Sequence, residues 1–216
     1  MRDIYQEQLK HLHRELQAMG AACEEIIDLA ARALTDCSRE LAEETARVGA
    51  SIDQSERTIE DTCLKLLLRQ QPVAGDLRKI SAAMKMITDM ERIGDQAEDI
   101  VDLVPKMKPG APKNNAPIRE MAKAARYMVT QAVEAFVRQD QALAQAVTEY
   151  DDVVDNYFNG IKGGILDFIA ANPGEGEYAL DLLMVAKYFE RIGDHATNIA
   201  EWVIFSVTGV HPETNE

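Results

Sequence analysis

ERIGDQAEDI, residues 91–100, and ERIGDHATNI, residues 190–199, share the pentapeptide Glu-Arg-Ile-Gly-Asp and decide how this chain of 216 residues is organised. Each copy lies in a strongly helical context, where a glycine costs about 1 kcal/mol relative to alanine. A glycine that recurs at this cost needs a compensating role. Because glycine has no Cβ, it would let a facing helix or a side-chain cluster approach closely.

The apolar residues around both copies recur at helical spacing. They are Ile93, Ala97, Ile100 and Val104 in the first copy and Ile192, Ala196, Ile199 and Val203 in the second. No stretch of the chain shows the sustained alternation of apolar and polar residues that is typical of a β-strand. The sequence therefore predicts an all-α fold.

The repeat extends beyond the pentapeptide. Its offset of 99 residues, from 91 to 190, also aligns Asp53 with Asp152 and Glu56 with Asp155, and an offset of 102 aligns Met19 with Met121. Each half then contains three helices, and a Pro-rich tract separates the halves. We expect three-helix bundles at 1–104 and 118–208 with a linker at 105–117, and helices near 4–35, 38–70, 74–104, 117–137, 140–171 and 176–208.

The formal net charge of −14 argues against nucleic acid as a partner, because phosphate binding needs clustered Lys and Arg. Cys23, Cys37 and Cys63 are odd in number and have no CxxC spacing, so a reducing cytoplasm is expected rather than a disulfide framework. The longest uncharged tract is too short to cross a bilayer. We expect no membrane insertion, and attachment at the inner face of a membrane only through protein partners.

Acidic residues line one face of each repeated helix. Glu91, Asp95 and Asp99 follow i, i+4, i+8 spacing, and Glu190, Asp194 and Asn198 repeat it. The preceding helix of each half adds a pair of carboxylates, namely Asp53 and Glu56 in the first half and Asp152 and Asp155 in the second. Oxygen ligands from two facing helices are how helical bundles hold hard divalent or trivalent metal ions. The pattern predicts a metal site in each half.

Other interpretations remain open. An acidic stripe is commonly a solvated helix face, and glycine can serve helix packing alone. His195 follows the second stripe, but its counterpart is Gln96, so a surface or capping histidine is expected rather than a ligand. The chain has no phosphate-binding loop, dinucleotide fingerprint or nucleophile elbow. A metal-dependent hydrolase acting from the carboxylates and a purely structural helical scaffold stay as alternatives to an adaptor.

The two ERIGD segments, the RQQPVAGDLR stretch that precedes the first of them, and the duplicated three-helix layout resemble the PhoU family over essentially the whole chain. The resemblance implies two three-helix bundles related by pseudo-twofold symmetry. It also implies metal binding by the ten residues named above, with iron, zinc, magnesium and manganese as candidate ions. Asn198 in place of Asp99 would make the two sites unequal.

The resemblance further implies the function and the partners. Members of the family are understood as non-enzymatic cytoplasmic adaptors between a phosphate ABC transporter, through its ATPase subunit, and a phosphate-sensing histidine kinase. They negatively regulate the phosphate-starvation response when phosphate is plentiful. A homodimer is also expected. Neither periodicity nor charge indicates phosphate, which enters only through the resemblance.

Overall fold

The computed structural model describes residues 2–36, 38–70, 72, 74–107 and 116–211. These residues form six α-helices and two short 3-10 turns, and no strand occurs among them. The helices are α1 (Arg2–Ala33), α2 (Arg39–Gln70), α3 (Ala74–Leu103), α4 (Ala116–Arg138), α5 (Gln141–Ala171) and α6 (Gly176–Thr208), and the turns are η1 (Val104–Lys106) and η2 (Pro173–Glu175). The predicted all-α fold is confirmed, and the helix boundaries lie close to those expected from the sequence.

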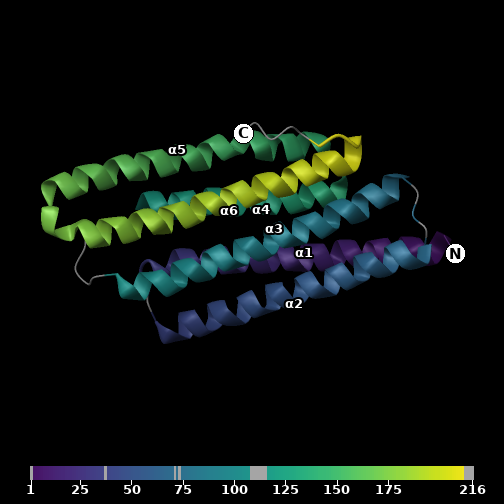
Figure 1. Ribbon diagram of the computed structural model, residues 1–216, viewed down its shortest axis with the longest axis horizontal. Coiled ribbons are helices and arrows are strands. Elements are labelled where there is room, and N and C mark those ends of the chain that lie inside the picture. Colours follow the sequence, from purple (N-terminus) through teal and green to yellow (C-terminus); the bar gives the residue numbers. More distant parts are fainter. Residues whose placement is uncertain (1, 37, 71, 73, 108–115, 212–216) are drawn as a thin grey trace.

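The helices run along the long axis of the molecule as two antiparallel bundles placed side by side (Figure 1). Helix α2 packs on α1 and α3, and α5 packs on α4 and α6. The bundles meet through α1 and α3 on one side and α4 and α6 on the other, with α3 lying along α6. The arrangement is the duplicated pair of three-helix bundles that the sequence predicts.

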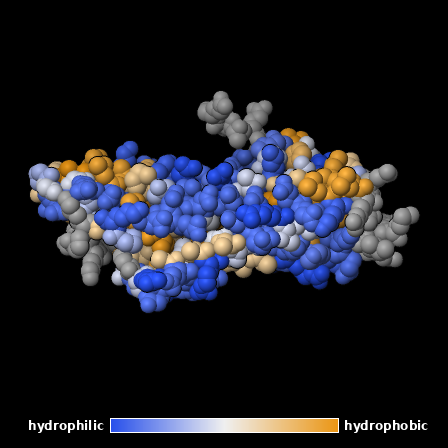
Figure 2. Space-filling model, turned by 60° about the horizontal axis from the view of Figure 1, so that its bottom comes forward, coloured by the Kyte–Doolittle hydropathy of each residue, from blue (hydrophilic) through white to orange (hydrophobic). Residues whose placement is uncertain are grey.

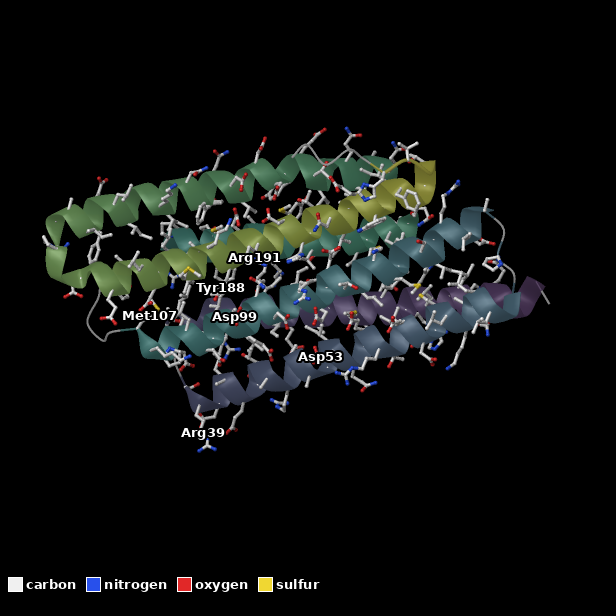
Figure 3. The ribbon with its side chains drawn as sticks, in the orientation of Figure 1. Arg39, Asp53, Asp99, Met107, Tyr188 and Arg191 are labelled. Atoms are coloured by element: carbon white, nitrogen blue, oxygen red, sulfur yellow. The ribbon has the colours of Figure 1, made fainter. Side chains whose placement is uncertain are left out.

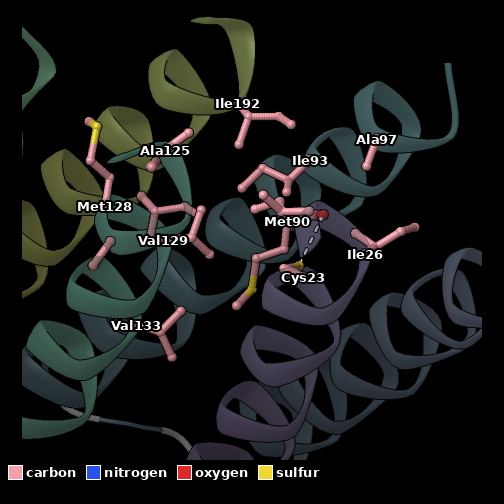
Figure 4. Packing of buried hydrophobic residues seen from close by; sticks show 14 of the residues in the cluster. Cys23, Ile26, Met90, Ile93, Ala97, Ala125, Met128, Val129, Val133 and Ile192 are labelled. Carbon is pink, nitrogen blue, oxygen red and sulfur yellow. Dashed lines mark hydrogen bonds between the residues drawn. The ribbon is translucent and has the colours of Figure 1, made fainter. Parts of the chain in front are cut away.

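A single hydrophobic core runs through both bundles. Met90 of α3 and Ile192 of α6 are fully buried at the boundary between the halves, together with Val129 of α4 (Figure 4). The buried thiol of Cys23 donates a hydrogen bond to the carbonyl oxygen of Met90, 3.5 Å away. Because burial of apolar area is the main favourable term in folding, a shared core of this kind fixes the halves against each other.

Two matching caps set the starts of α2 and α5. The Ser38 hydroxyl accepts a hydrogen bond from the Leu41 amide, and the Asp140 carboxylate accepts one from the Leu143 amide. Such caps satisfy amides that the first helical turn leaves without partners. The two caps are 102 residues apart, from 38 to 140, which gives the register between the second helices of the two halves.

Some expectations lie outside the described residues. Most of the Pro-rich linker expected at 105–117 falls there, as does Cys37. Cys23 and Cys63 are buried free thiols, and burial raises the pKa of each to about 12. None of the described helices combines the length and the apolar composition that a membrane crossing requires.

Candidate functional site

The repeated glycines are contact points between helices. A Cβ at Gly94 would lie 3.3 Å from the side chain of Ile52, and a Cβ at Gly193 would lie 3.2 Å from that of Val154. Both distances are shorter than ordinary van der Waals contact, so any larger residue would push α2 away from α3, or α5 away from α6. The close approach predicted from the sequence is confirmed. It brings the acidic face of α3 next to α2, and that of α6 next to α5.

The same contacts correct the register of the repeat. Ile52 and Val154 occupy the same place against the repeated glycine, so α2 and α5 correspond at an offset of 102 residues rather than 99. The helix caps give the same offset. The expected equivalence of Asp53 with Asp152 is therefore wrong, and Asp53 corresponds to Asp155. Glu56, expected to match Asp155, corresponds to Phe158.

The first acidic cluster joins α2 to α3. We define it as Asp53 and Glu56 of α2 with Glu91, Asp95 and Glu98 of α3. Burial raises the pKa of Glu91, and the neighbouring charges of Asp95, Glu56 and Asp53 raise it further. The pKa of Glu56 is raised mainly by burial too, with Glu60 and Asp53 adding to the shift. These directions show that the carboxylates are close enough to repel one another.

Glu98 was not predicted as a member of this cluster. Its carboxylate lies across Gly49, where a Cβ would overlap it. Burial raises its pKa, and Asp53 and Asp95 contribute. On the outer side of the cluster, Arg92 Nη1 lies 3.2 Å from Asp95 Oδ2, and Arg92 Nε lies 3.5 Å from Glu91 Oε2. The guanidinium group offsets part of the negative charge of the cluster.

The second acidic cluster joins α5 to α6. We define it as Asp151 and Asp155 of α5 with Glu190 and Asp194 of α6. Burial raises the pKa of Asp151 to about 6, with Asp194 and Asp155 adding to the shift and the Thr197 hydroxyl opposing it. Partial desolvation also raises the pKa of Asp194, and Glu190 contributes.

The second cluster also contains a cation. Lys187 Nζ donates a hydrogen bond to Glu190 Oε1 at 2.5 Å and lies 5.4 Å from the centroid of the Phe158 ring. The position of Lys187 in the first half is held by Thr88, which carries no charge. The second cluster is therefore less negative than the first.

Three of the predicted site residues lie apart from the clusters. Asp152 is exposed, and its neighbour Asp151 takes the place in the cluster that the sequence assigned to it. Asp99 is exposed in the region between α3 and α6, where Arg191 opposes the upward pKa shift caused by partial desolvation and by Asp95 (Figure 3). Asn198 donates a hydrogen bond to Asp89 of α3 at 3.1 Å.

His195 differs from the expectation of a surface or capping residue. It is half-buried, and its Nδ1 lies 2.9 Å from Asp89 Oδ1. The carboxylate of Asp89 on α3 thus interacts with both His195 and Asn198 of α6, and these contacts connect the two halves. The counterpart of Asp89 in the second half, at an offset of 99, is Tyr188, which cannot accept hydrogen bonds in the manner of a carboxylate.

The two acidic clusters concentrate negative charge, but their side chains do not form a metal-coordination site. Within the described residues, no three His, Cys, Asp or Glu side chains are positioned to hold a metal ion together. The donor chemistry nevertheless suits a hard cation, since every cluster member is a carboxylate. The raised pKa values indicate negative charge that a bound cation would compensate.

Sequence signals for the missed residues do exist. Glu98 lies seven residues after Glu91, two helical turns along the same face, and Asp151 lies four residues before Asp155. A separate alignment of the second helices would have matched Asp53 with Asp155. The 99-residue offset of the pentapeptide concealed it, because Gly94 follows Ile52 by 42 residues whereas Gly193 follows Val154 by 39, and the difference lies within the helices rather than in the connection between them.

The comparisons with known proteins agree with the duplicated helical fold. The family model described as the PhoU domain matches residues 16–104 and again residues 118–203. The chain is 33% identical over 204 residues to the phosphate-specific transport system accessory protein PhoU homolog of Pseudomonas aeruginosa, covering 94% of this chain and 84% of the relative. It is 32% identical over 219 residues to the homolog of the same name from Clostridium acetobutylicum, covering 100% and 99%.

Solved structures show the same fold. The crystal structure of PhoU from Pseudomonas aeruginosa superimposes with a TM-score of 0.89 at 33% identity, covering 95% of this chain and 100% of that one. The phosphate transport system regulatory protein PhoU from Streptococcus pneumoniae also gives a TM-score of 0.89, at 24% identity, which shows the fold alone. With both halves matched by the family model and relatives above 30% identity along its length, this chain belongs to the PhoU family.

Proposed function

We propose that this protein is a non-enzymatic adaptor of a phosphate transport system, which represses the phosphate-starvation response when phosphate is plentiful. The observation that carries the proposal is the family match in both halves, with relatives of nearly the same length named as transport system accessory proteins. We place the protein in the cytoplasm. Its proposed partners there are the ATPase subunit of the transporter and a membrane-bound, phosphate-sensing histidine kinase.

The net charge supports contact with basic surfaces on such partners. Oppositely charged surfaces attract each other over a Debye length of about 10 Å at 0.1 M salt, so the association should weaken as salt is added. A homodimer is part of the proposal, as the resemblance to the PhoU family implies.

A deletion strain tests the regulatory role. We expect a reporter of a phosphate-starvation gene to stay active in abundant phosphate without this protein, and to be repressed again when the gene is restored. Co-purification from the complemented strain at low and high salt should recover the ATPase subunit and the kinase, with less recovered at high salt. Normal repression in the deletion strain would reject the adaptor function. Turnover of phosphate esters by the purified, metal-loaded protein would instead favour the hydrolase.

We propose also that the acidic clusters bind metal ions, with iron, zinc, magnesium and manganese as candidates. The carboxylate chemistry and the raised pKa values support this. Because the described side chains do not converge on one point, binding would have to draw carboxylates of both helices together. The ion would supply charge compensation between helices, holding α2 to α3 and α5 to α6.

Elemental analysis tests the metal proposal. We expect the double variant Glu91→Gln, Asp95→Asn to lose the metal of the first cluster and keep that of the second, and Asp155→Asn, Asp194→Asn to do the reverse. Asp152→Asn is the control, because Asp152 is exposed and lies outside both clusters. Unchanged metal content in both double variants would remove the clusters as metal sites.

A further inference from the structure

An apolar groove opens at the end of the second bundle. It lies between the start of α4, the C-terminal part of α5 and the start of α6, and its volume is about 520 Å³. The lining side chains include Ile118, Ile161, Ile165, Phe168, Ala179 and Leu182. Near it, Leu166 and Leu180 are each exposed by about 60%. Figure 2 shows hydrophobic atoms gathered at the left end of the molecule, the end at which α5 and α6 meet.

The groove exists because the first helices of the two halves differ in length. At the offset of 102 residues, the first residue of α4, Ala116, corresponds to residue 14 of α1, yet α1 begins at Arg2. Within the part of the chain that the structure describes, the second half has no counterpart of the first three turns of α1. Figure 1 shows α5 and α6 extending beyond the start of α4 at the left end.

The first half shows what fills the equivalent space. Ile161, Ile165 and Phe168 of α5 correspond to Ile59, Cys63 and Leu66 of α2, which are at most 1% exposed. Leu9 and Leu12 of α1 are buried in the same core, and α1 packs along α2. The first turns of α1 therefore cover this part of α2. Leu9 and Leu12 follow the i, i+3 spacing of an amphipathic helix.

The surroundings indicate the charge of the occupant. The segments that flank the groove carry more acidic than basic residues, namely Glu120, Asp167, Glu175, Glu177 and Asp181 against Arg119 and Lys162. A basic helix would complement them, whereas an anionic membrane would be repelled by a protein of net charge −14. Residues 108–115, which precede α4 in the chain, include no large apolar side chain.

We propose that this groove binds an amphipathic helix of a partner protein, with leucine-like side chains at i, i+3 spacing and basic residues beside them. The bound helix takes the place that residues 2–13 of α1 hold in the first half. This is the helix-in-groove mode of recognition, in which a few apolar anchors enter a preformed hydrophobic surface. The inference rests on the proposed adaptor function only in that a partner supplies the helix.

The chain itself provides the probe. A fluorescein-labelled peptide of residues 2–13, RDIYQEQLKHLH, is titrated with the full-length protein and followed by fluorescence anisotropy. We expect saturable binding that a peptide with Leu9→Ser and Leu12→Ser loses. A peptide with Asp3→Lys and Glu7→Lys should bind more tightly, and its gain should fall as salt is added. No saturable binding, or equal binding by the serine peptide, would overturn the proposal.

Two neighbouring glycines give a matched pair of protein variants. Gly164 lines the groove and Gly163 does not, and a Cβ at either position meets open space. Each change to leucine also removes a helix glycine, so both variants should fold at least as well as the wild type. We expect Gly164→Leu to weaken the peptide about ten-fold or more, equal to about 1.4 kcal/mol, and Gly163→Leu to leave it nearly unchanged. Equal loss in both variants would contradict binding in the groove.

Other occupants give distinct results. If a second copy fills the groove, Gly164→Leu will convert a dimer into a monomer by light scattering while Gly163→Leu will not, which overturns the proposal. Sedimentation with phosphatidylcholine–phosphatidylserine vesicles that Gly164→Leu abolishes would overturn it in favour of a membrane. None of these measurements uses phosphate, the transporter or the kinase, so their failure leaves the proposed regulatory function standing.

Discussion

The two acidic clusters occupy equivalent places and are built from different residues. In the first half, Gly49 of α2 makes room for Glu98 of α3. In the second half the corresponding residues are Asp151 and Thr197, so the carboxylate comes from the opposite helix. Each cluster therefore keeps an acidic group at the same level of the helix pair. The duplication has preserved local charge and helix spacing rather than individual side chains.

The clusters also differ in how their charge is balanced. Glu56 of the first half is replaced by Phe158, and Thr88 by Lys187, which binds Glu190 in the second half. The first cluster thus has more negative charge and no internal lysine. If both clusters bind cations, the first should bind more tightly, because hard ions gain affinity with the number of charged ligands. The glycines behind them, in contrast, make nearly the same contact.

The largest expected effect tests that shared contact. Gly94→Leu and Gly193→Leu would each force a side chain into space already held by Ile52 or Val154. We expect each to lower the free energy of unfolding by about 3 kcal/mol, in spite of the gain in helix propensity. Urea unfolding followed by circular dichroism measures this. Gly163→Leu is the control, because it faces open space and should not destabilise the protein. Similar stability in all three variants would show that the glycines do not set the helix spacing.

A smaller effect of opposite sign is expected at Asp151. Its folded-state pKa of about 6 lies above the unfolded value of 3.8, so the charged carboxylate destabilises the folded state at neutral pH. With chelator present, we expect Asp151→Asn to raise the free energy of unfolding at pH 7.5 by about 2 kcal/mol. The wild type should regain this stability as the pH falls from above 6 towards 4, so the gain of the variant should shrink over that range.

Asp152→Asn is the control for that measurement. Asp152 is adjacent in sequence and exposed, and it carries the same charge. We expect a change within about 0.5 kcal/mol at either pH, as for most surface substitutions. If Asp152→Asn stabilised the protein as much as Asp151→Asn, the carboxylate of Asp151 would not be the one that α6 desolvates.

An exchange between the halves tests the swapped carboxylate. Gly49→Asp alone places a second acid beside Glu98 and should lower the free energy of unfolding by about 1 kcal/mol. Adding Glu98→Thr reproduces the pair found in the second half and should recover the loss. The double-mutant cycle should give a favourable coupling of about 1 kcal/mol. Additive effects would mean that the two positions do not share one space.

The smallest effect is expected at the residue that first suggested unequal sites. Asp99→Asn gives the first half the residue of the second, but Asp99 is exposed, so solvent screens its repulsion from Asp95 and Glu98. We expect a change in stability within about 0.5 kcal/mol. The reverse change, Asn198→Asp, should cost more, because it removes the hydrogen bond to Asp89 and places a second carboxylate beside it. Equal effects would contradict the different surroundings of these two residues.

Patterns along the chain were enough to predict the helical fold, the duplication and most of the first cluster. Apolar periodicity and proline breaks are local signals, and they place each helix within a few residues. The repeated glycine also indicated a close helix contact, which Ile52 and Val154 provide. The four predicted acids of the first cluster share two helix faces that this contact brings together, so their spacing in the sequence revealed them.

The pairing of acids across the helices depends on the tertiary structure. The helices of the two halves differ in length, so no single offset relates the halves. One helix position also changes the direction of a side chain by about 100°. That rotation separates Asp151 from Asp152. The contact of His195 and Asn198 with Asp89, and the groove beside the shorter α4, join residues that are distant in the chain. Such contacts arise from packing between helices and bundles, which local spacing along one helix does not specify.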